Sequence, residues 1–206
     1  MNPAGDYDYL IGSMRNQYDN VSTIVGVLFA NPNRTLVKQE ILENLEYANK
    51  RSGTYIDFYF AGYSEYKTYD EQEKVICAPN GKEWYFSPKM YIDFINKFEE
   101  CSKWKYSGET ELLLLEYKNG TLCFDKVILL WIEKLVRDAN IYSVSNLFET
   151  IYRVARDRTE ISKFSYFLIY KKIKGSVFDI ICSYINEKFR KIIKSTIVYA
   201  IKDFSK

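Results

Sequence analysis

The chain has 206 residues, of which 47 % are apolar and 17 % aromatic, and it contains no histidine. Without histidine, the chain cannot form a catalytic site that uses an imidazole base, and it lacks the commonest transition-metal ligand. The four cysteines lie far apart, in or beside apolar segments: Cys77, Cys101, Cys123 and Cys182. We therefore expect buried, reduced thiols and no cofactor or metal.

Charge is distributed unevenly along the chain. Residues 151–206 hold 13 Lys and Arg and 5 Asp and Glu, a net charge of +8, whereas residues 1–150 hold 16 and 22, a net charge of −6. The basic end is expected either to bind something acidic or to dock on the acidic body. Residues 1–20 lack the apolar core of a signal peptide, and no apolar run approaches the roughly 20 residues that span a bilayer. We expect a soluble, cytoplasmic protein.

The first third of the chain predicts two strands separated by a helix. Residues 7–18 favour a short helix at the N-terminus. The apolar run 23–30 predicts a buried strand, and residues 55–61 predict a second strand with alternating side chains. Between them, residues 36–51 carry mostly apolar positions at helical spacing, and Gly53 is expected to end that helix.

The middle of the chain is expected to begin with an insertion. Residues 62–81 are polar and rich in tyrosine, which is typical of a long loop, and such loops are often functional. Residues 83–86 predict a short strand. Ser87 followed by Pro88 is the start signal of a helix, which we expect over residues 89–105.

A hairpin and several helices are expected next. The leucine-rich run 111–117 predicts a buried strand, Asn119–Gly120 a tight turn, and residues 121–124 the returning strand. Asp125 is expected to cap a helix over residues 126–138. The remaining segments are expected to be helical, over residues 143–156, about 161–173 and from Ser176 to about Phe204.

This order of elements resembles the thioredoxin-like superfamily over roughly residues 22–139. Residues 112–120, LLLLEYKNG, are similar to the central strand and hairpin of thioredoxins. The resemblance implies that the paired redox cysteines would fall near Asn31 and Arg34, and that the family's cis-proline would stand where Gly108–Thr110 stands here. Thiol exchange needs a thiolate of lowered pKa at a helix N-terminus. The resemblance therefore implies the fold without the redox activity.

The predicted fold class is α/β, with a thioredoxin-like mixed sheet flanked by helices and a C-terminal helical extension. We expect an N-terminal segment over residues 1–19, the thioredoxin-like domain over 20–140 and an all-helical extension over 141–206. The main expectation is a non-catalytic interaction or scaffold protein, which binds a protein partner or itself.

Two surfaces of the α/β domain are candidate binding sites. The turn after the first strand presents helix N–H groups that suit an anion or a partner's carboxylate, unless Asn31 simply caps the helix and Arg34 is solvated. Its residues are Asn31, Asn33 and Arg34, with Glu109 and Thr110 beside them. The second surface is the tyrosine loop, with Tyr63, Tyr66 and Tyr69. Its acidity favours a protein partner over nucleic acid, unless the rings only cover a sheet edge.

The last predicted helix is the third candidate surface. Isoleucines alternate there with basic residues, which include Lys188, Arg190, Lys191 and Lys194. Such a helix packs on its own domain, forms a homo-oligomer or partner interface, or binds nucleic acid or an anionic surface.

An enzyme is the remaining alternative. Glu116 and Lys118 match half of the PD-(D/E)xK nuclease pattern, and Asp57 would supply the second carboxylate for Mg²⁺. Against this hypothesis, no Pro-Asp pair is present, and Asn119–Gly120 ends the strand early.

Overall fold

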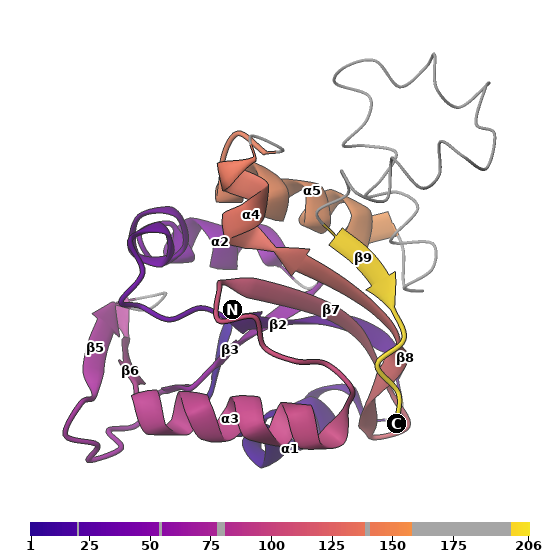
Figure 1. The fold of residues 1–206 in the computed structure, drawn as a ribbon, viewed down its shortest axis with the longest axis horizontal. Helices are drawn as coiled ribbons and strands as arrows, with labels where there is room; N and C mark the ends of the chain where they lie inside the picture. The colour runs from indigo at the N-terminus through magenta and orange to yellow at the C-terminus, as the bar shows by residue number, and fades with distance from the viewer. Residues whose placement is uncertain (20, 54, 78–80, 139–140, 158–198) are drawn as a thin grey trace.

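A six-stranded mixed sheet forms the centre of the computed structural model (Figure 1). The structure describes residues 1–19, 21–53, 55–77, 81–138, 141–157 and 199–206. The strands are, in spatial order, β1 (Asn2–Ala4), β3 (Asp57–Ala61), β2 (Thr23–Phe29), β7 (Glu111–Lys118), β8 (Thr121–Trp131) and β9 (Tyr199–Lys202). Strand β3 is parallel to both β1 and β2, and the pairs from β2 to β9 are antiparallel.

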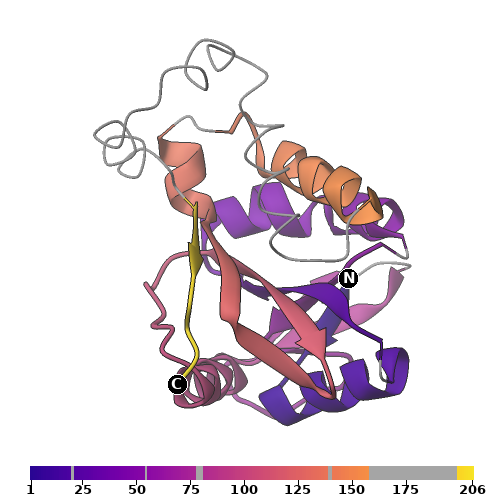
Figure 2. The ribbon, with the colours of Figure 1, turned by 90° about the vertical axis from the view of Figure 1, so that its right-hand side faces the viewer.

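Helices cover both faces of this sheet (Figure 1, Figure 2). One face carries α1 (Tyr7–Tyr18) and α3 (Pro88–Cys101), the opposite face carries α2 (Leu45–Ser52) and α5 (Val144–Asp157), and α4 (Ile132–Arg137) follows the end of β8. The predicted α/β class, with a mixed sheet flanked by helices, is confirmed. Because both faces are covered, the central strands are largely apolar on both faces rather than alternating. Tyr59 on β3 is accordingly fully buried.

Aromatic side chains fill the layer between the sheet and α3. Phe29 at the end of β2 lies 5.8 Å from Phe94, 5.4 Å from Phe98 and 4.6 Å from Trp104, measured between ring centroids. All four rings are fully buried. Much of the unusual aromatic content therefore belongs to the core, where large rings contribute most to burial.

Side chains cap the starts of α1 and α3, and the Ser87–Pro88 signal predicted the second of these. Residues 7–18 form α1 as expected, and the Asp6 carboxylate accepts the Tyr9 N–H at 2.7 Å. Ser87 caps α3 by accepting the Met90 N–H at 3.1 Å, with Pro88 in the first turn. Each cap satisfies a backbone donor that a helix start leaves without a partner. Helix α5 also confirms its prediction to within one residue.

The single helix predicted over residues 36–51 is interrupted. A π-helical turn, η1 (Val37–Leu42), precedes α2. The side-chain amide of Asn44 donates to the carbonyls of Gln39 and Glu40, both at 3.3 Å, so it competes with the regular helical bonds.

The tyrosine-rich segment after β3 belongs to a second sheet. Strands β4 (Tyr63–Ser64) and β5 (Lys74–Cys77) both pair with β6 (Glu83–Phe86). Gly62 connects this sheet to the main one, because its N–H donates to Ala4 at 2.8 Å and its carbonyl accepts the Ser87 N–H at 3.1 Å. Asp70 fastens the loop to α3 by accepting the Ser87 hydroxyl.

Two helix predictions near the end of the chain are wrong in part. Of the helix expected over 126–138, residues 132–137 form α4, whereas residues 126–131 continue β8. Ile128–Leu130 pairs there with β7 on one side and β9 on the other. Residues 199–202 form β9 rather than the end of a helix. The Phe204 N–H donates to the Phe124 carbonyl at 2.6 Å, which anchors the chain end to β8.

The rest of the predicted helical extension lies outside the described residues. This applies to the helix expected over 161–173, to most of the last helix and to its basic residues, Lys188, Arg190, Lys191 and Lys194. The domain bounds at residues 19 and 140 stay a prediction, although residues 1–19 contribute β1 and α1, and residues 199–202 contribute β9. No helix in the described part of the chain is long and apolar enough to cross a membrane.

Candidate functional site

Four chain segments meet at one end of the main sheet. The parallel strands β1, β2 and β3 all end there, at Ala4, Phe29 and Ala61. Strand β7 begins at the same end, since Glu111 pairs with Phe29. In open α/β sheets, ligands bind beyond the carboxyl ends of the parallel strands. This end is therefore the best candidate for a functional site.

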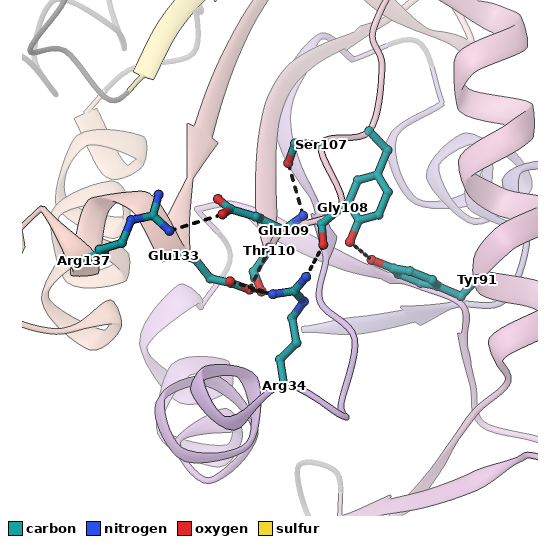
Figure 3. Close-up of polar contacts among 9 residues, drawn as sticks. Arg34, Tyr91, Ser107, Gly108, Glu109, Thr110, Glu133 and Arg137 are labelled. Carbon is teal, nitrogen blue, oxygen red and sulfur yellow. Dashed lines mark hydrogen bonds and ion pairs between the residues drawn. The ribbon is translucent and has the colours of Figure 1, made fainter.

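Arg34 joins two of these segments (Figure 3). It follows a turn in which the Asn31 side chain accepts the Asn33 N–H at 2.9 Å and the Asn31 carbonyl accepts the Arg34 N–H at 3.1 Å. The Arg34 guanidinium donates from Nη1 to both carboxylate oxygens of Glu133, at 2.8 and 2.7 Å, and from Nη2 to the Gly108 carbonyl. The turn that would carry the redox cysteines is thus bonded to the loop before β7.

Glu133 is the centre of this cluster (Figure 3). Its Oε1 accepts the Thr110 backbone N–H at 3.1 Å and the Thr110 hydroxyl at 2.7 Å, besides the bonds from Arg34. Thr110 is fully buried, whereas the side chains of Glu133 and Arg34 are 18 % and 36 % exposed. The predicted residues Arg34 and Thr110 therefore share one carboxylate, and the charge of Arg34 is neutralised within the protein.

The edge of the cluster is more exposed. Glu109 forms an ion pair with Arg137 at 3.2 Å, in which 32 % and 58 % of the two side chains are exposed. On the other side, the Tyr91 hydroxyl lies 2.8 Å from the Tyr106 hydroxyl (Figure 3). Burial raises the pKa of both phenols, so they stay neutral hydrogen-bonding groups at neutral pH.

A buried carboxyl, Glu111, lies directly behind the cluster. It accepts the Trp104 indole N–H at 3.0 Å and the Ser107 N–H at 3.2 Å. Burial raises the pKa of Glu111 above its ordinary value, and the hydrogen bonds from Ser107 and Trp104 only partly oppose this rise. Because burial raises its pKa, the protonation of Glu111 is linked to folding.

We expect stability to fall as the pH rises through the titration of Glu111. Above the ordinary glutamate pKa of about 4.3, the unfolded chain has released this proton while the folded chain still holds it, so raising the pH favours unfolding, by about 1.4 kcal/mol for each unit of pKa difference. Urea unfolding from about pH 5 upward measures this slope, because carboxylates with lowered pKa values titrate at lower pH. The buried Met1 ammonium, whose pKa is lowered, acts in the opposite direction but equally in every variant, so the difference between variants isolates Glu111. Glu111→Gln is expected to flatten the slope, and Glu109→Gln, the adjacent control, to leave it unchanged. An unchanged slope in Glu111→Gln would contradict the prediction.

The tyrosine loop approaches the same end of the sheet, although its tyrosines differ in exposure. Tyr63 is fully buried and donates its hydroxyl to the Ala30 carbonyl at 2.7 Å. The prediction that Tyr63 belongs to an exposed binding surface is therefore wrong. Tyr66 and Tyr69 are 75 % and 89 % exposed. The Lys74 ammonium donates to the Asn33 side chain, which links this loop to the Arg34 turn.

The structure does not bring the proposed nuclease residues together. Val25 pairs with both Asp57 and Leu115, so these two side chains share a face, and the neighbouring Glu116 points to the opposite face. Asp57 accepts hydrogen bonds from Asn2, Gln17 and Tyr18, and Glu116 accepts the Ser22 hydroxyl at 2.7 Å. Lys118 is exposed at the hairpin end of β7. Among the described residues, no group of three or more histidine, cysteine or carboxylate side chains is placed to hold a metal ion.

Sequence reasoning missed the two residues that organise this end of the sheet. Glu133 was expected in a helix without a role, and Glu111 was expected only as the start of a strand. Nothing local distinguishes Glu133, which acquires its partners from segments distant in sequence, such as Arg34, 99 residues away. The partners of Glu111, Ser107 and Trp104, lie 4 and 7 residues away along the chain. Of the cysteines, Cys101 and Cys123 are half-buried free thiols.

Comparison with models of protein families, with curated proteins and with solved structures finds no match to this chain.

Proposed function

We propose that this chain is a redox-inactive, thioredoxin-like protein that binds a protein partner and catalyses no reaction. The observation that carries the proposal is the bond from Arg34 to Gly108 across 74 residues of sequence. The resemblance implies that the redox turn and the cis-proline position lie side by side, and here those positions are Asn31–Arg34 and Gly108–Thr110. In place of a thiolate, the first position holds an arginine that is paired with Glu133.

The side chains at this end of the main sheet suit noncovalent binding of a protein. Arg34 and Glu133 neutralise each other, and Thr110 is buried beneath them, so these groups hold the loops in place. The adjoining loop presents exposed aromatic groups, Tyr66 and Tyr69. Exposed tyrosines on an anchored loop supply contact area at low cost in side-chain entropy, which is typical of protein interfaces.

Site-specific photo-crosslinking in the source cell tests the proposal. A benzophenone side chain replaces Tyr66 or Tyr69 in the full chain, and a third variant carries it at Tyr55, which is 49 % exposed and precedes β3 at the opposite end of the sheet. We expect one crosslinked product, identified by mass spectrometry, from positions 66 and 69 and not from position 55. The partner is another protein or a second copy of this chain.

Two results would count against this function. Equal crosslinking from position 55 would show contact without a preferred face. The absence of a discrete product from positions 66 and 69 would remove this end of the sheet as a binding surface.

A further inference from the structure

A hollow of about 110 Å³ lies beside the tyrosine loop, where the start of α1, strand β4 and the first turn of α3 meet. Aromatic and thioether groups line it, together with two carboxylates: Tyr9, Tyr63, Tyr66, Met90, Asp6 and Glu65. Tyr9 is 51 % exposed and Tyr66 75 % exposed, so the hollow is open to a partner at the surface. It lies next to Gly5, which directly follows β1, and therefore belongs to the proposed binding end.

We propose that this hollow receives a basic side chain, lysine or arginine, of the protein partner. This inference rests on the proposed function and specifies the chemistry of the partner. Tyrosine rings attract cations through their negative faces, and a methionine sulfur packs well against a polarisable group. Among the residues that the structure describes, the hollow is lined by two carboxylates and by no lysine or arginine.

The size of the hollow fits the end of a long basic side chain. One water molecule takes about 30 Å³ of the liquid, so the hollow holds the equivalent of about four waters. That space suits an ammonium or guanidinium head with its adjoining methylene groups. The Met90 side chain already packs closely against the backbone of Gly5, since a Cβ added at Gly5 would lie 2.3 Å from the Met90 methyl group.

Both carboxylates can interact with an incoming cation. Among the described residues, Asp6 accepts one side-chain hydrogen bond, from the Tyr9 N–H to Oδ1. Glu65 lies 3.4 Å from the Lys82 ammonium, in a pair with 38 % and 60 % exposed side chains. Exposed pairs of this kind contribute little, so a partner cation can displace Lys82. The positive end of the α1 dipole opposes a cation, but it amounts to about half a charge against two full carboxylates.

A second hollow near the first is also lined by several acidic residues. Further along the loop, a wider hollow of about 480 Å³ is lined by Asp70, Glu71 and Asp93, and Lys89 is the one basic residue among its described lining residues. Ile92, which is 56 % exposed, also lines it. A partner segment with several basic residues and an apolar one therefore complements both hollows.

The proposal is tested by titrating the full chain with n-butylammonium and, separately, with butyrate, which has the opposite charge. The probe is the ¹³C-labelled methyl group of Met90, assigned with Met90→Leu, and the methyls of Met1 and Met14 serve as internal references. We expect a saturable shift of the Met90 signal with butylammonium alone, with a dissociation constant of about 1–10 mM. Tyr66→Ala is expected to weaken binding about three- to fivefold, and the control Tyr55→Ala to leave it unchanged.

Failure of this inference can be told apart from failure of the proposed function. Butyrate binding as tightly as butylammonium, or no saturable shift of Met90 with butylammonium, overturns the basic side chain as ligand. If crosslinking at Tyr66 and Tyr69 nevertheless succeeds, the binding function stands with a partner of different chemistry. If butylammonium binds and crosslinking fails, the hollow accepts a cation but the protein-binding function is wrong, and the inference about the partner falls with it.

Discussion

Replacing Glu133 by alanine is expected to lower the free energy of unfolding by about 3 kcal/mol. The carboxylate accepts two bonds from Arg34 and two from Thr110, at 2.7 to 3.1 Å. Its removal leaves the guanidinium without its counter-charge and the N–H of a fully buried residue without its acceptor. A buried donor or charge that loses its partner keeps the full free-energy cost of desolvation. This cost exceeds the net stabilisation that a satisfied hydrogen bond contributes.

Arg137→Ala is the matched control for this prediction. Arg137 pairs with Glu109 at the edge of the same cluster, where both side chains are substantially exposed. Exposed ion pairs contribute up to about 1 kcal/mol, so we expect a loss at or below that amount. Chemical denaturation of the three proteins measures the difference. Equal losses for the Glu133 and Arg137 variants would show that Glu133 does not organise this end of the sheet.

Gly62→Ala is expected to lower the free energy of unfolding by about 3 kcal/mol or more, because two costs add at this residue. Gly62 has a φ of +80°, which side chains other than glycine rarely adopt. An added Cβ would also lie 2.7 Å from the Cα of Tyr91 and 2.9 Å from its backbone nitrogen. Backbone atoms at the start of a capped helix cannot move away as a flexible side chain can.

Gly120→Ala separates these two costs. Gly120 has the same φ of +80°, and a Cβ there would have no neighbour within 4 Å among the described residues. We therefore expect a loss of about 1 kcal/mol, from backbone strain alone. Thermal and urea unfolding compare the variants. If Gly62→Ala is no more destabilised than Gly120→Ala, then α3 does not pack against the Gly62 backbone as closely as described.

Features with a local cause could be predicted from the sequence. The caps at Asp6 and Ser87 act within three residues of their own helix starts, so α1 and the start of α3 follow from short patterns. The strand at 111–117 and its Asn119–Gly120 turn are local in the same way. The extension of β8 could not be predicted, since an apolar run such as 127–130 suits a buried helix or a buried strand equally well. Its pairing with β7 and β9 decided between them.

For the candidate site, too, some features could be predicted from the sequence and others could not. The Arg34 turn and Thr110 were expected side by side, and in the structure both bond to Glu133, while the resemblance to thioredoxin-like proteins stays a prediction. No sequence pattern marked Glu133, because its carboxylate oxygens accept hydrogen bonds from residues that are far away in sequence. The same limit applies to the tyrosine loop, in which Tyr63 and Tyr66 stand in similar polar surroundings. One is fully buried and the other 75 % exposed, because only Tyr63 reaches the Ala30 carbonyl beneath the small sheet.

The sequence by itself determined which chemistry this chain lacks and where its local elements begin. Without histidine it has no imidazole, and the turn after β2, Asn31 to Arg34, has no thiol. Only the tertiary structure decided which charges neutralise each other and which carboxyl is buried, as for Glu133 and Glu111. The physical reason is that burial and ion pairing depend on segments that meet across the fold, whereas capping and turn formation act between neighbouring residues.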